Sequence, residues 1–394
     1  MEKTVDILGL AEEIAAGKRL KRSDDLSFFK NCDLAELEKG ADLIRKKYSG
    51  NRVDLCSIIN GKSGHCGENC KFCAQSAHNH TSCEVYGFLP EEKILAEAKK
   101  NQDAGVNRFA IVCAGRSTSG EDFEKAIHAY KRMKSELKIN LCASMGFLTR
   151  EQLRELRQAG VTSYHHNIET SKRNFPNICT SHTYEMKIQT IKMAQEEGLC
   201  VCSGGIIGMG ETFEDRLDMA VSLSELGVKS IPINALMAIP GTPYEKNTPL
   251  SEDEILRTIA MFRFINPEAN IRLAAGRKLL SNSGEKAFCS GASASITGDM
   301  LTTCGTTIAG DMKLLKSLGR DCGANYGSDC SLNCSSNCGS DYNQDCCSCD
   351  SCGSDSSDCS SNCASDCAGN SWASTCGSDC GSNSSCGNGK TCCA

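Results

Sequence analysis

An alternation of short apolar runs with amphipathic segments, between residues 51 and 320, constrains the fold of this chain more than any other feature. The eight apolar runs are expected to form strands at 52–59, 108–113, 140–145, 162–168, 200–207, 230–239, 270–275 and 287–296. Helix-like segments lie between them at 91–104, 121–137, 150–159, 184–197, 212–226 and 251–264. Such alternation is typical of a parallel sheet with crossover helices, and eight units predict an α/β fold, a (β/α)8 barrel of the TIM type.

The chain divides into three parts. Residues 1–50 are expected to form an N-terminal helical extension, residues 51–320 the barrel, and residues 321–394 a low-complexity tail. The helix expected at 251–264 opens with a capping box of Ser251 and Glu254. In such barrels functional residues come from the carboxyl ends of the strands and the loops after them, so motifs at those places carry the most weight.

The tail differs from the rest of the chain in composition. It holds 16 of the 29 cysteines, 19 serines and nine aspartates, but one leucine and no Val, Ile, Phe or Met. It cannot bury enough apolar surface to offset chain entropy, so without a ligand we expect it to be disordered. Its cysteines recur at intervals of four, as in Cys330, Cys334 and Cys338. The tail is either an extension without a role in catalysis or a reservoir for soft metals or iron–sulfur units.

Charge and hydropathy exclude two classes of protein. The nine aspartates and single lysine of the tail give the tail a net charge of about −8. Because the net charge of the whole chain is −6, residues 1–320 carry about +2. No basic stripe with interleaved aromatic residues marks a nucleic-acid surface, and no apolar stretch could span a membrane. The first 25 residues lack the apolar core of a secretory signal. We therefore expect a cytoplasmic protein, in which clustered cysteines are metal ligands more often than disulfides.

A cysteine triplet follows the first expected strand, with the spacing Cys66-x-x-x-Cys70-x-x-Cys73. Three thiolates on one loop can bind three irons of a four-iron four-sulfur (4Fe-4S) cluster and leave the fourth iron without a protein ligand. An iron with a free position can bind the amino and carboxylate groups of S-adenosylmethionine and pass an electron to its sulfonium. The triplet therefore predicts radical chemistry.

A closed zinc site is the alternative, with a fourth ligand from His65, His78 or Cys83. Closed zinc sites are typically built from two separated Cys-x-x-Cys pairs, which this loop lacks. The aromatic Phe72 directly before the last cysteine favours the iron–sulfur cluster, and we expect this side chain beside the bound cofactor.

The cysteine loop resembles that of the radical S-adenosylmethionine superfamily, and residues 15–320 as a whole resemble the biotin synthase family. The blocks that carry this resemblance, besides the loop, are 164–170, 202–212, 230–234, 241–243 and 271–277. The tail lies outside it. The resemblance implies the barrel fold, S-adenosylmethionine as cofactor, and a catalytic 4Fe-4S cluster on Cys66, Cys70 and Cys73.

Three further residues could hold a second cluster. Cys142, Cys202 and Arg272 lie in the third, fifth and seventh expected strands, and alternate strands of a barrel contribute to one interior layer. An arginine inside a barrel needs an anionic partner, which a thiolate-bound cluster would supply. Buried cysteines acting as small apolar side chains are the alternative. The resemblance implies the same three residues as ligands of an auxiliary, sulfur-donating two-iron (2Fe-2S) cluster.

One expected ligand is missing. The family has a cysteine in the second strand where this chain has Ala110, and the nearest cysteine is Cys113. An offset of three residues points to the opposite face of a strand unless a bulge intervenes. Either Cys113 supplies the missing thiolate, or the auxiliary cluster has other ligands or more iron, or the second cluster has been lost.

The resemblance also assigns the cofactor and substrate contacts. Gly208, Gly210 and Glu211 follow the fifth strand and would cradle the methionyl part of S-adenosylmethionine, although a plain strand-to-helix turn needs the same residues. Asn167 and Glu169 end the fourth strand and could hydrogen-bond the ribose hydroxyls, Glu169 being one methylene longer than the usual aspartate.

Two residues are assigned to the substrate. Asn234 matches a family residue that binds the ureido ring of dethiobiotin. His165 stands where the family usually has another substrate-contacting asparagine, which weakens the assignment of the substrate more than that of the reaction type.

The activity that the resemblance implies is that of a radical sulfurtransferase. Cleavage of S-adenosylmethionine would yield a 5′-deoxyadenosyl radical that removes hydrogen from dethiobiotin, and sulfur from the auxiliary cluster would close the ring of biotin. A flavodoxin- or ferredoxin-like electron donor and a homodimer are also implied. Two alternatives stay open: a sulfur-inserting enzyme or maturase acting on another small substrate, or a metal or iron–sulfur delivery protein that works through the tail.

Overall fold

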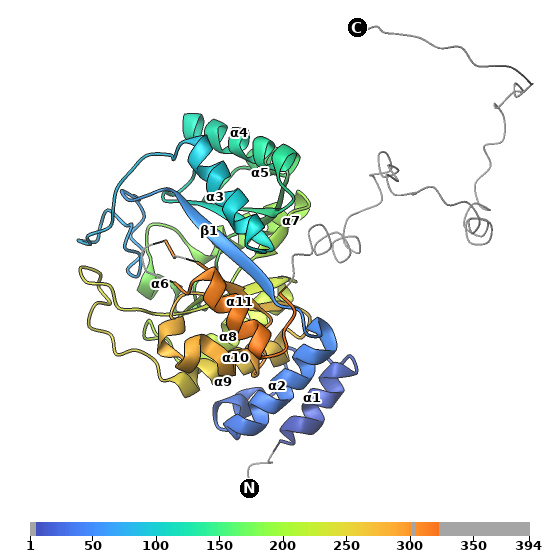
Figure 1. Ribbon diagram of the computed structural model, residues 1–394. Helices are drawn as coiled ribbons and strands as arrows, with labels where there is room; N and C mark the ends of the chain where they lie inside the picture. Colours follow the sequence, from blue (N-terminus) through green and yellow to red (C-terminus); the bar gives the residue numbers. More distant parts are fainter. Residues whose placement is uncertain (1–4, 299, 302–304, 323–394) are drawn as a thin grey trace, which may run out of the picture. The chain divides into compact units, whose positions relative to one another are not determined.

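The computed structural model describes residues 5–298, 300–301 and 305–322 (Figure 1). Its centre is one parallel sheet of nine strands in the order β5-β4-β3-β2-β1-β9-β8-β7-β6, which closes because β5 also pairs with β7. The strands are β1 (Asp54–Lys62), β2 (Arg108–Cys113), β3 (Asn140–Ser144), β4 (Val161–His165), β5 (Cys200–Cys202), β6 (Gly205–Ile207), β7 (Ser230–Ala235), β8 (Asn270–Leu273) and β9 (Ala294–Ile296).

The strands β5 and β6 together occupy one position of an eight-membered barrel, because both pair with β7 and they are separated by only two residues. The break lies beside Pro232 of β7, which has no N–H to donate to a ladder. A Cβ on Gly204 would lie 1.9 Å from the Pro232 carbonyl oxygen, so this close approach requires glycine. The (β/α)8 barrel expected from the alternating pattern is confirmed.

The helices of the barrel follow the expected segments within two residues at each end. They are α3 (Glu91–Asp103), α4 (Gly120–Glu136), α5 (Arg150–Gln158), α7 (Tyr184–Glu196), α8 (Phe213–Glu225) and α9 (Glu252–Ile265). Ser251 and Glu254 form the expected capping box at the start of α9. Shorter or later helices are α6 (Phe175–Ile178), α10 (Glu285–Phe288) and α11 (Ile308–Ser317). Figure 1 shows α3, α4, α5 and α7 around one part of the barrel and α8 to α11 around another.

The eighth apolar run was expected to be a strand from 287 to 296, and here the expectation is wrong in part. Ala287 and Phe288 lie in α10 and are buried, and only Ala294–Ile296 forms β9. A short apolar run does not distinguish a strand from a buried helical turn, because both bury every side chain.

Two helices and a 3-10 turn precede the barrel: α1 (Ile7–Ala15), η1 (Ser27–Lys30) and α2 (Leu34–Ser49). Figure 1 shows α1 and α2 side by side. The helix α2 packs closely on α9, since a Cβ on Gly40 would lie 2.7 Å from the ring of Phe264. Phe29 of η1 meets the same ring edge-on, with centroids 5.5 Å apart.

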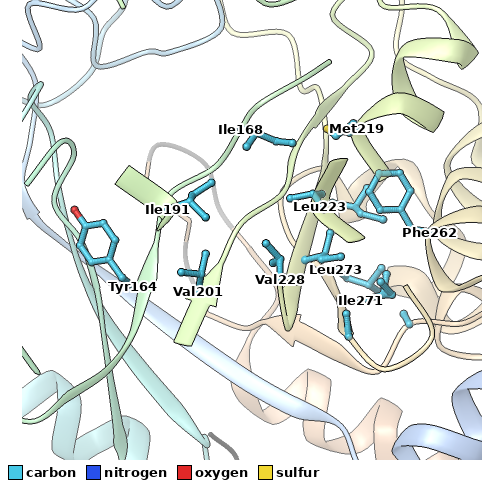
Figure 2. Packing of buried hydrophobic residues seen from close by; sticks show 14 of the residues in the cluster. Tyr164, Ile168, Ile191, Val201, Met219, Leu223, Val228, Phe262, Ile271 and Leu273 are labelled. Atoms are coloured by element: carbon cyan, nitrogen blue, oxygen red, sulfur yellow. The ribbon is translucent and has the colours of Figure 1, made fainter. Parts of the chain in front are cut away.

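An apolar core fills the space between the barrel and its helices. In Figure 2, Met219 and Leu223 of α8 and Phe262 of α9 lie on the side to which Ile271 and Leu273 of β8 point. Burial of side chains of this size stabilises the fold by roughly 1.5–3 kcal/mol each. Because side chains alternate along a strand, the same strand turns the residues between them into the barrel. The outer core therefore determines which residues face the interior.

No helix in the described ranges is long and apolar enough to cross a membrane. The expectations for the repeated tail cysteines, Cys330 onward, lie outside the described residues.

Candidate active site in the barrel

A cavity of about 640 Å³ occupies the barrel interior. Alternate residues of the strands line it, as the pleat requires. The strands contribute Asp54, Cys56, Ile58, Arg108, Ala110, Val112, Cys142, Ser144, Ser163, His165, Cys202, Ser230, Asn234, Asn270, Arg272 and Ile296, among others. The loop after β1 adds Cys66, Cys70, Phe72 and Cys73. One cavity thus brings together the cysteine loop and the interior thiols that were singled out in the sequence.

Hydrogen bonds to backbone carbonyls within the cysteine loop stabilise its conformation. The Cys66 N–H donates to the Gln75 carbonyl (2.9 Å), and the Asn79 side chain donates to the carbonyls of Cys70 (3.2 Å) and Cys73 (2.8 Å). All three thiols are free and partly buried, and burial raises the pKa of Cys73 to about 11. Three thiols on one loop that faces a cavity fit a cluster bound through three irons.

A fourth thiol, which sequence reasoning missed, lies against this loop. The Sγ of Cys179 is 3.7 Å from that of Cys70 and 3.4 Å from Nδ1 of His182, and these three side chains could hold a metal ion. The hydrogen bond between the two thiols raises the pKa of Cys70 and lowers that of Cys179. More than 100 residues separate Cys70 from Cys179, and no spacing in the sequence relates them.

Glu68 joins the cysteine loop to the segment that carries Cys179. Its carboxylate accepts hydrogen bonds from Ser181 Oγ (2.6 Å), His182 Nδ1 (2.5 Å) and Arg116 (2.9 Å). Burial would raise the pKa of Glu68, but these three donors lower it to about 2. A charged network therefore anchors the loop to the segment that carries Cys179.

Deeper in the barrel, Arg272 has an anionic partner in the protein itself. Its guanidinium donates to the carboxylate of Asp54 at 2.5 Å, and Arg108 donates to the same carboxylate at 2.9 Å. Burial would raise the pKa of Asp54, but the two arginines lower it to about 2. The anion that we expected a cluster to provide for Arg272 is thus at least partly provided by Asp54, a residue not singled out in the sequence.

The thiols of Cys142 and Cys202 line the same cavity as Arg272. Cys202 donates to Ser230 Oγ at 3.3 Å, and Arg272 Nε lies 3.4 Å from the same oxygen. Cys142 packs in a small buried cluster with Cys56 and Ala110. The structure therefore brings the three predicted auxiliary residues together and adds Cys56, whose only signal in the sequence is its place inside the first expected strand.

Cys113 does not join that cluster. The inward side chains of β2 are those of Arg108, Ala110 and Val112, whereas Cys113, the last residue of the strand, borders the cavity but packs in the outer core. The pairing irregularity near it lies in β1, between Asn60 and Lys62, and β2 stays regular against β3. The idea that Cys113 takes the place of a ligand at Ala110 is not supported by this geometry, because no bulge in β2 turns the thiol inward.

The expected cofactor residues lie around the loops after β4 and β6. The side-chain oxygen Oδ1 of Asn167 accepts from Gly204 N–H (3.0 Å), and its side-chain Nδ2 donates to the Glu169 carboxylate (3.3 Å). Gly208 and Gly210 have φ of +95° and +91°, a conformation that favours glycine. Their turn lies between β6 and α8, and Gly208, Gly210 and Glu211 are not among the residues that line the cavity.

Glu211 has a positioning role in this turn. Its buried carboxylate accepts from the N–H groups of Gly208 (2.8 Å) and Met209 (2.7 Å) and from Arg216 Nε (2.7 Å). These contacts use both carboxylate oxygens, so Glu211 stabilises the conformation of the glycine turn.

The two expected substrate residues also line the cavity. Asn234 bridges two backbones, donating to the Gly205 carbonyl (3.0 Å) and accepting from Ala275 N–H (3.1 Å). Its second amide hydrogen and second lone pair remain for a ligand. His165 is partly buried, and desolvation lowers the pKa of its imidazole.

Two family models match the chain, the Radical SAM superfamily over residues 62–223 and the Biotin and Thiamin Synthesis associated domain over residues 232–321. The biotin synthase of Alkaliphilus metalliredigens is 61% identical over 80% of this chain and 99% of its own length. That of Clostridium beijerinckii is 60% identical over 79% and 98%. A methylornithine synthase structure shares the fold, with TM-score 0.69 and 19% identity over 79% of this chain and 96% of its own. This chain therefore belongs to the biotin synthase family, within the radical S-adenosylmethionine superfamily.

Proposed function

We propose that this chain is a biotin synthase, an enzyme that inserts sulfur into dethiobiotin to form biotin. The observation that carries this proposal is one cavity lined both by the cysteine loop and by Cys142, Cys202 and Arg272. A sulfur-inserting reaction needs a radical source and a sulfur donor within reach of one small substrate, and a shared cavity supplies this proximity.

The donor sets fit two clusters. Cys66, Cys70 and Cys73 would hold the 4Fe-4S cluster, and Cys142, Cys202 and Arg272 would contribute to the auxiliary cluster. When bound, the first cluster and S-adenosylmethionine supply a 5′-deoxyadenosyl radical, and the auxiliary cluster supplies sulfur.

The glycine turn after β6 and the end of β4 would bind S-adenosylmethionine. Gly208 and Gly210 offer backbone without side chains, and Glu211 keeps the turn in shape. Asn167 and Glu169 would hydrogen-bond the ribose hydroxyls, and Phe72 lines the cavity beside the cysteines. A site inside a barrel limits the access of water and oxidants to a reactive radical.

Dethiobiotin would lie between the two groups, bound by Asn234 and His165. A neutral imidazole offers one donor and one acceptor, and so does the free half of the Asn234 amide. The cyclic urea of dethiobiotin presents N–H donors and a carbonyl acceptor, which match these groups. Electrons would come from a flavodoxin- or ferredoxin-like protein, and a homodimer is our expectation from the family.

The test is an anaerobic assay with dethiobiotin, S-adenosylmethionine and a chemical reductant, in which 5′-deoxyadenosine and biotin are quantified by mass spectrometry. We expect both products from the full chain. We expect neither above background from Cys70→Ala, because one of the three cluster ligands is gone. Cys32→Ala is the matched control, since Cys32 lies outside the cavity lining and should leave both products unchanged.

Two results would contradict the proposal. Formation of 5′-deoxyadenosine by Cys70→Ala would exclude the radical reaction at this loop. Formation of 5′-deoxyadenosine without biotin in the full chain would favour the alternative substrate that His165 keeps open.

A further inference from the structure

We propose that Cys56 is the third thiolate ligand of the auxiliary cluster, in place of the thiol that is missing at Ala110. The inference deepens the proposed function, on which it rests for the presence of that cluster. Three observations support it. Cys56 packs against Cys142, it lies in the same interior layer of the barrel as the expected ligands, and the other strand cysteines lie outside that layer.

The contact joins Cys56 directly to an expected ligand. Cys56, Ala110 and Cys142 form a buried cluster of their own, separate from the outer core. Cys56 and Cys142 pack against each other in this cluster, and the two residues are only 9% and 6% exposed. Ala110 contributes only a methyl group to this cluster, so the sulfur ligands there come from β1 and β3.

The strand pairings place Cys56 at the same level as the three expected residues. In a barrel of eight strands with a shear of eight, a level advances by one residue from each strand to the next. Each step goes from a residue to its paired residue on the next strand and then one residue forward along that strand. From Cys56, these steps lead through the observed pairings and back to Cys56. The residues reached are Phe109, Cys142, Tyr164, Cys202, Ile231, Arg272 and Ser295. Four of these eight residues line the cavity: Cys56, Cys142, Cys202 and Arg272.

The other four residues on the path face away from the barrel. Phe109, Tyr164 and Ile231 belong to the outer apolar core, and Ser295 contacts Arg277 there. One interior layer of the barrel is therefore composed of three thiols and one guanidinium, contributed by alternate strands. Ala110 lies on a strand between two members of the layer and is offset from it by one residue.

The two other strand cysteines that could serve as the third ligand, Cys113 and Cys200, lie outside this interior layer. Cys113 borders the cavity but packs in the outer core, and not with Cys56, Ala110 and Cys142. Cys200 lies two residues before Cys202 on the same strand, so it is one level below the layer. Of the cysteines on described strands, Cys56 is the one that completes a layer with Cys142, Cys202 and Arg272.

The experiment compares three single variants of the full chain, prepared anaerobically with iron and sulfide: Cys56→Ala, Cys113→Ala and Cys200→Ala. Iron and sulfide per chain are measured together with Mössbauer spectra, and the tail cysteines are the same in every sample. We expect Cys56→Ala to lose the iron, the sulfide and the Mössbauer component of the auxiliary cluster. The cluster at Cys66, Cys70 and Cys73 should stay, and both control variants should match the wild type.

A double variant separates loss of a ligand from loss of the fold. Ala110→Cys in the Cys56→Ala chain places a thiol on the next strand within the same contact cluster. We expect it to restore a second cluster, whereas a chain that Cys56→Ala had unfolded would not recover.

Retention of the second cluster by Cys56→Ala, or an equal loss in Cys113→Ala, would overturn the proposal. A wild-type chain with only one cluster would overturn it as well. These readouts do not depend on turnover, so a chain that binds both clusters through Cys56 but forms no biotin would refute the proposed function and leave the ligand assignment intact.

Discussion

At the scale of single residues, Asp215 shows how a buried carboxylate ties the cofactor turn to the barrel. Its side chain, 2% exposed, accepts from Ser171 Oγ (2.6 Å), Arg173 Nε (3.0 Å) and the backbone N–H of Thr212 (2.8 Å). Burial would raise the pKa of Asp215, but these donors outweigh it and lower the pKa below its usual value. Thr212 directly follows Glu211, so the same carboxylate fixes the start of α8 behind the glycine turn.

We expect Asp215→Asn to weaken the acid dependence of stability. Because the folded pKa lies below the unfolded value of about 3.9, this carboxylate stabilises the fold above that pH and its contribution is lost as the pH falls. The variant should be less stable by about 2 kcal/mol at pH 7, and the difference should shrink below about pH 4. Urea unfolding of the cluster-free chain between pH 3 and pH 7, followed by circular dichroism, measures it.

Asp253→Asn is the matched control, because Asp253 lies in the first turn of the neighbouring helix α9 and is exposed. It should keep the pH dependence of the wild type. A difference between Asp215→Asn and wild type that stays constant down to pH 3 would refute the linkage.

At the scale of elements, the last helix is attached to the barrel by a buried ion pair. Arg277 follows β8, and its guanidinium donates to both oxygens of Asp311 in α11, at 2.8 and 3.0 Å. The same guanidinium also donates to Ser295 and Thr306. Both charged side chains are almost fully buried, at 5% and 2% exposure. Removing one partner of such a pair leaves the other charge buried without compensation.

We expect Asp311→Asn to lower the free energy of unfolding by about 3–5 kcal/mol. Glu13→Gln is the control, since Glu13 pairs with Lys18 on the surface of α1, where both side chains are about half exposed. That change should cost at most about 1 kcal/mol. Urea unfolding at pH 7 compares the two, and similar losses would show that the Arg277–Asp311 pair does not secure α11.

At the scale of the whole molecule, the barrel ends close to residue 322. The backbone of Asp321 hydrogen-bonds with the backbones of Asn51 and Val53, just before the start of β1. The family model ends at residue 321, and the Alkaliphilus relative is matched over 99% of its length by 315 residues. A chain cut after residue 320 would lose these backbone hydrogen bonds, so a cut after Cys322 is the better test of the tail.

We expect a chain that ends at Cys322 to bind both barrel clusters and to form biotin in a single turnover at the rate of the full chain. The reason is that every residue assigned to the reaction lies before that point. Single-turnover formation of biotin, together with iron per chain, measures it. Loss of biotin formation with both barrel clusters still bound would instead support a delivery role for the tail.

The sequence by itself determined the elements and the loop chemistry of this protein. Helix periodicity, the capping box at Ser251 and the spacing of Cys66, Cys70 and Cys73 are local patterns, and local patterns are visible in a linear chain. They were sufficient to predict the barrel and six of its helices. They did not predict α11, the break between β5 and β6, or the helical part of the apolar run at 287–296.

Only the tertiary structure decided which residues meet inside the barrel. Cys56 and Cys113 are both cysteines on expected strands, and which of them faces Cys142 depends on strand register and closure. The partnership of Asp54 with Arg272 joins residues 218 apart, and that of Cys179 with Cys70 joins residues 109 apart. Register around a closed sheet is a property of all eight strands at once, because a slip of one residue in any strand exchanges its inner and outer faces.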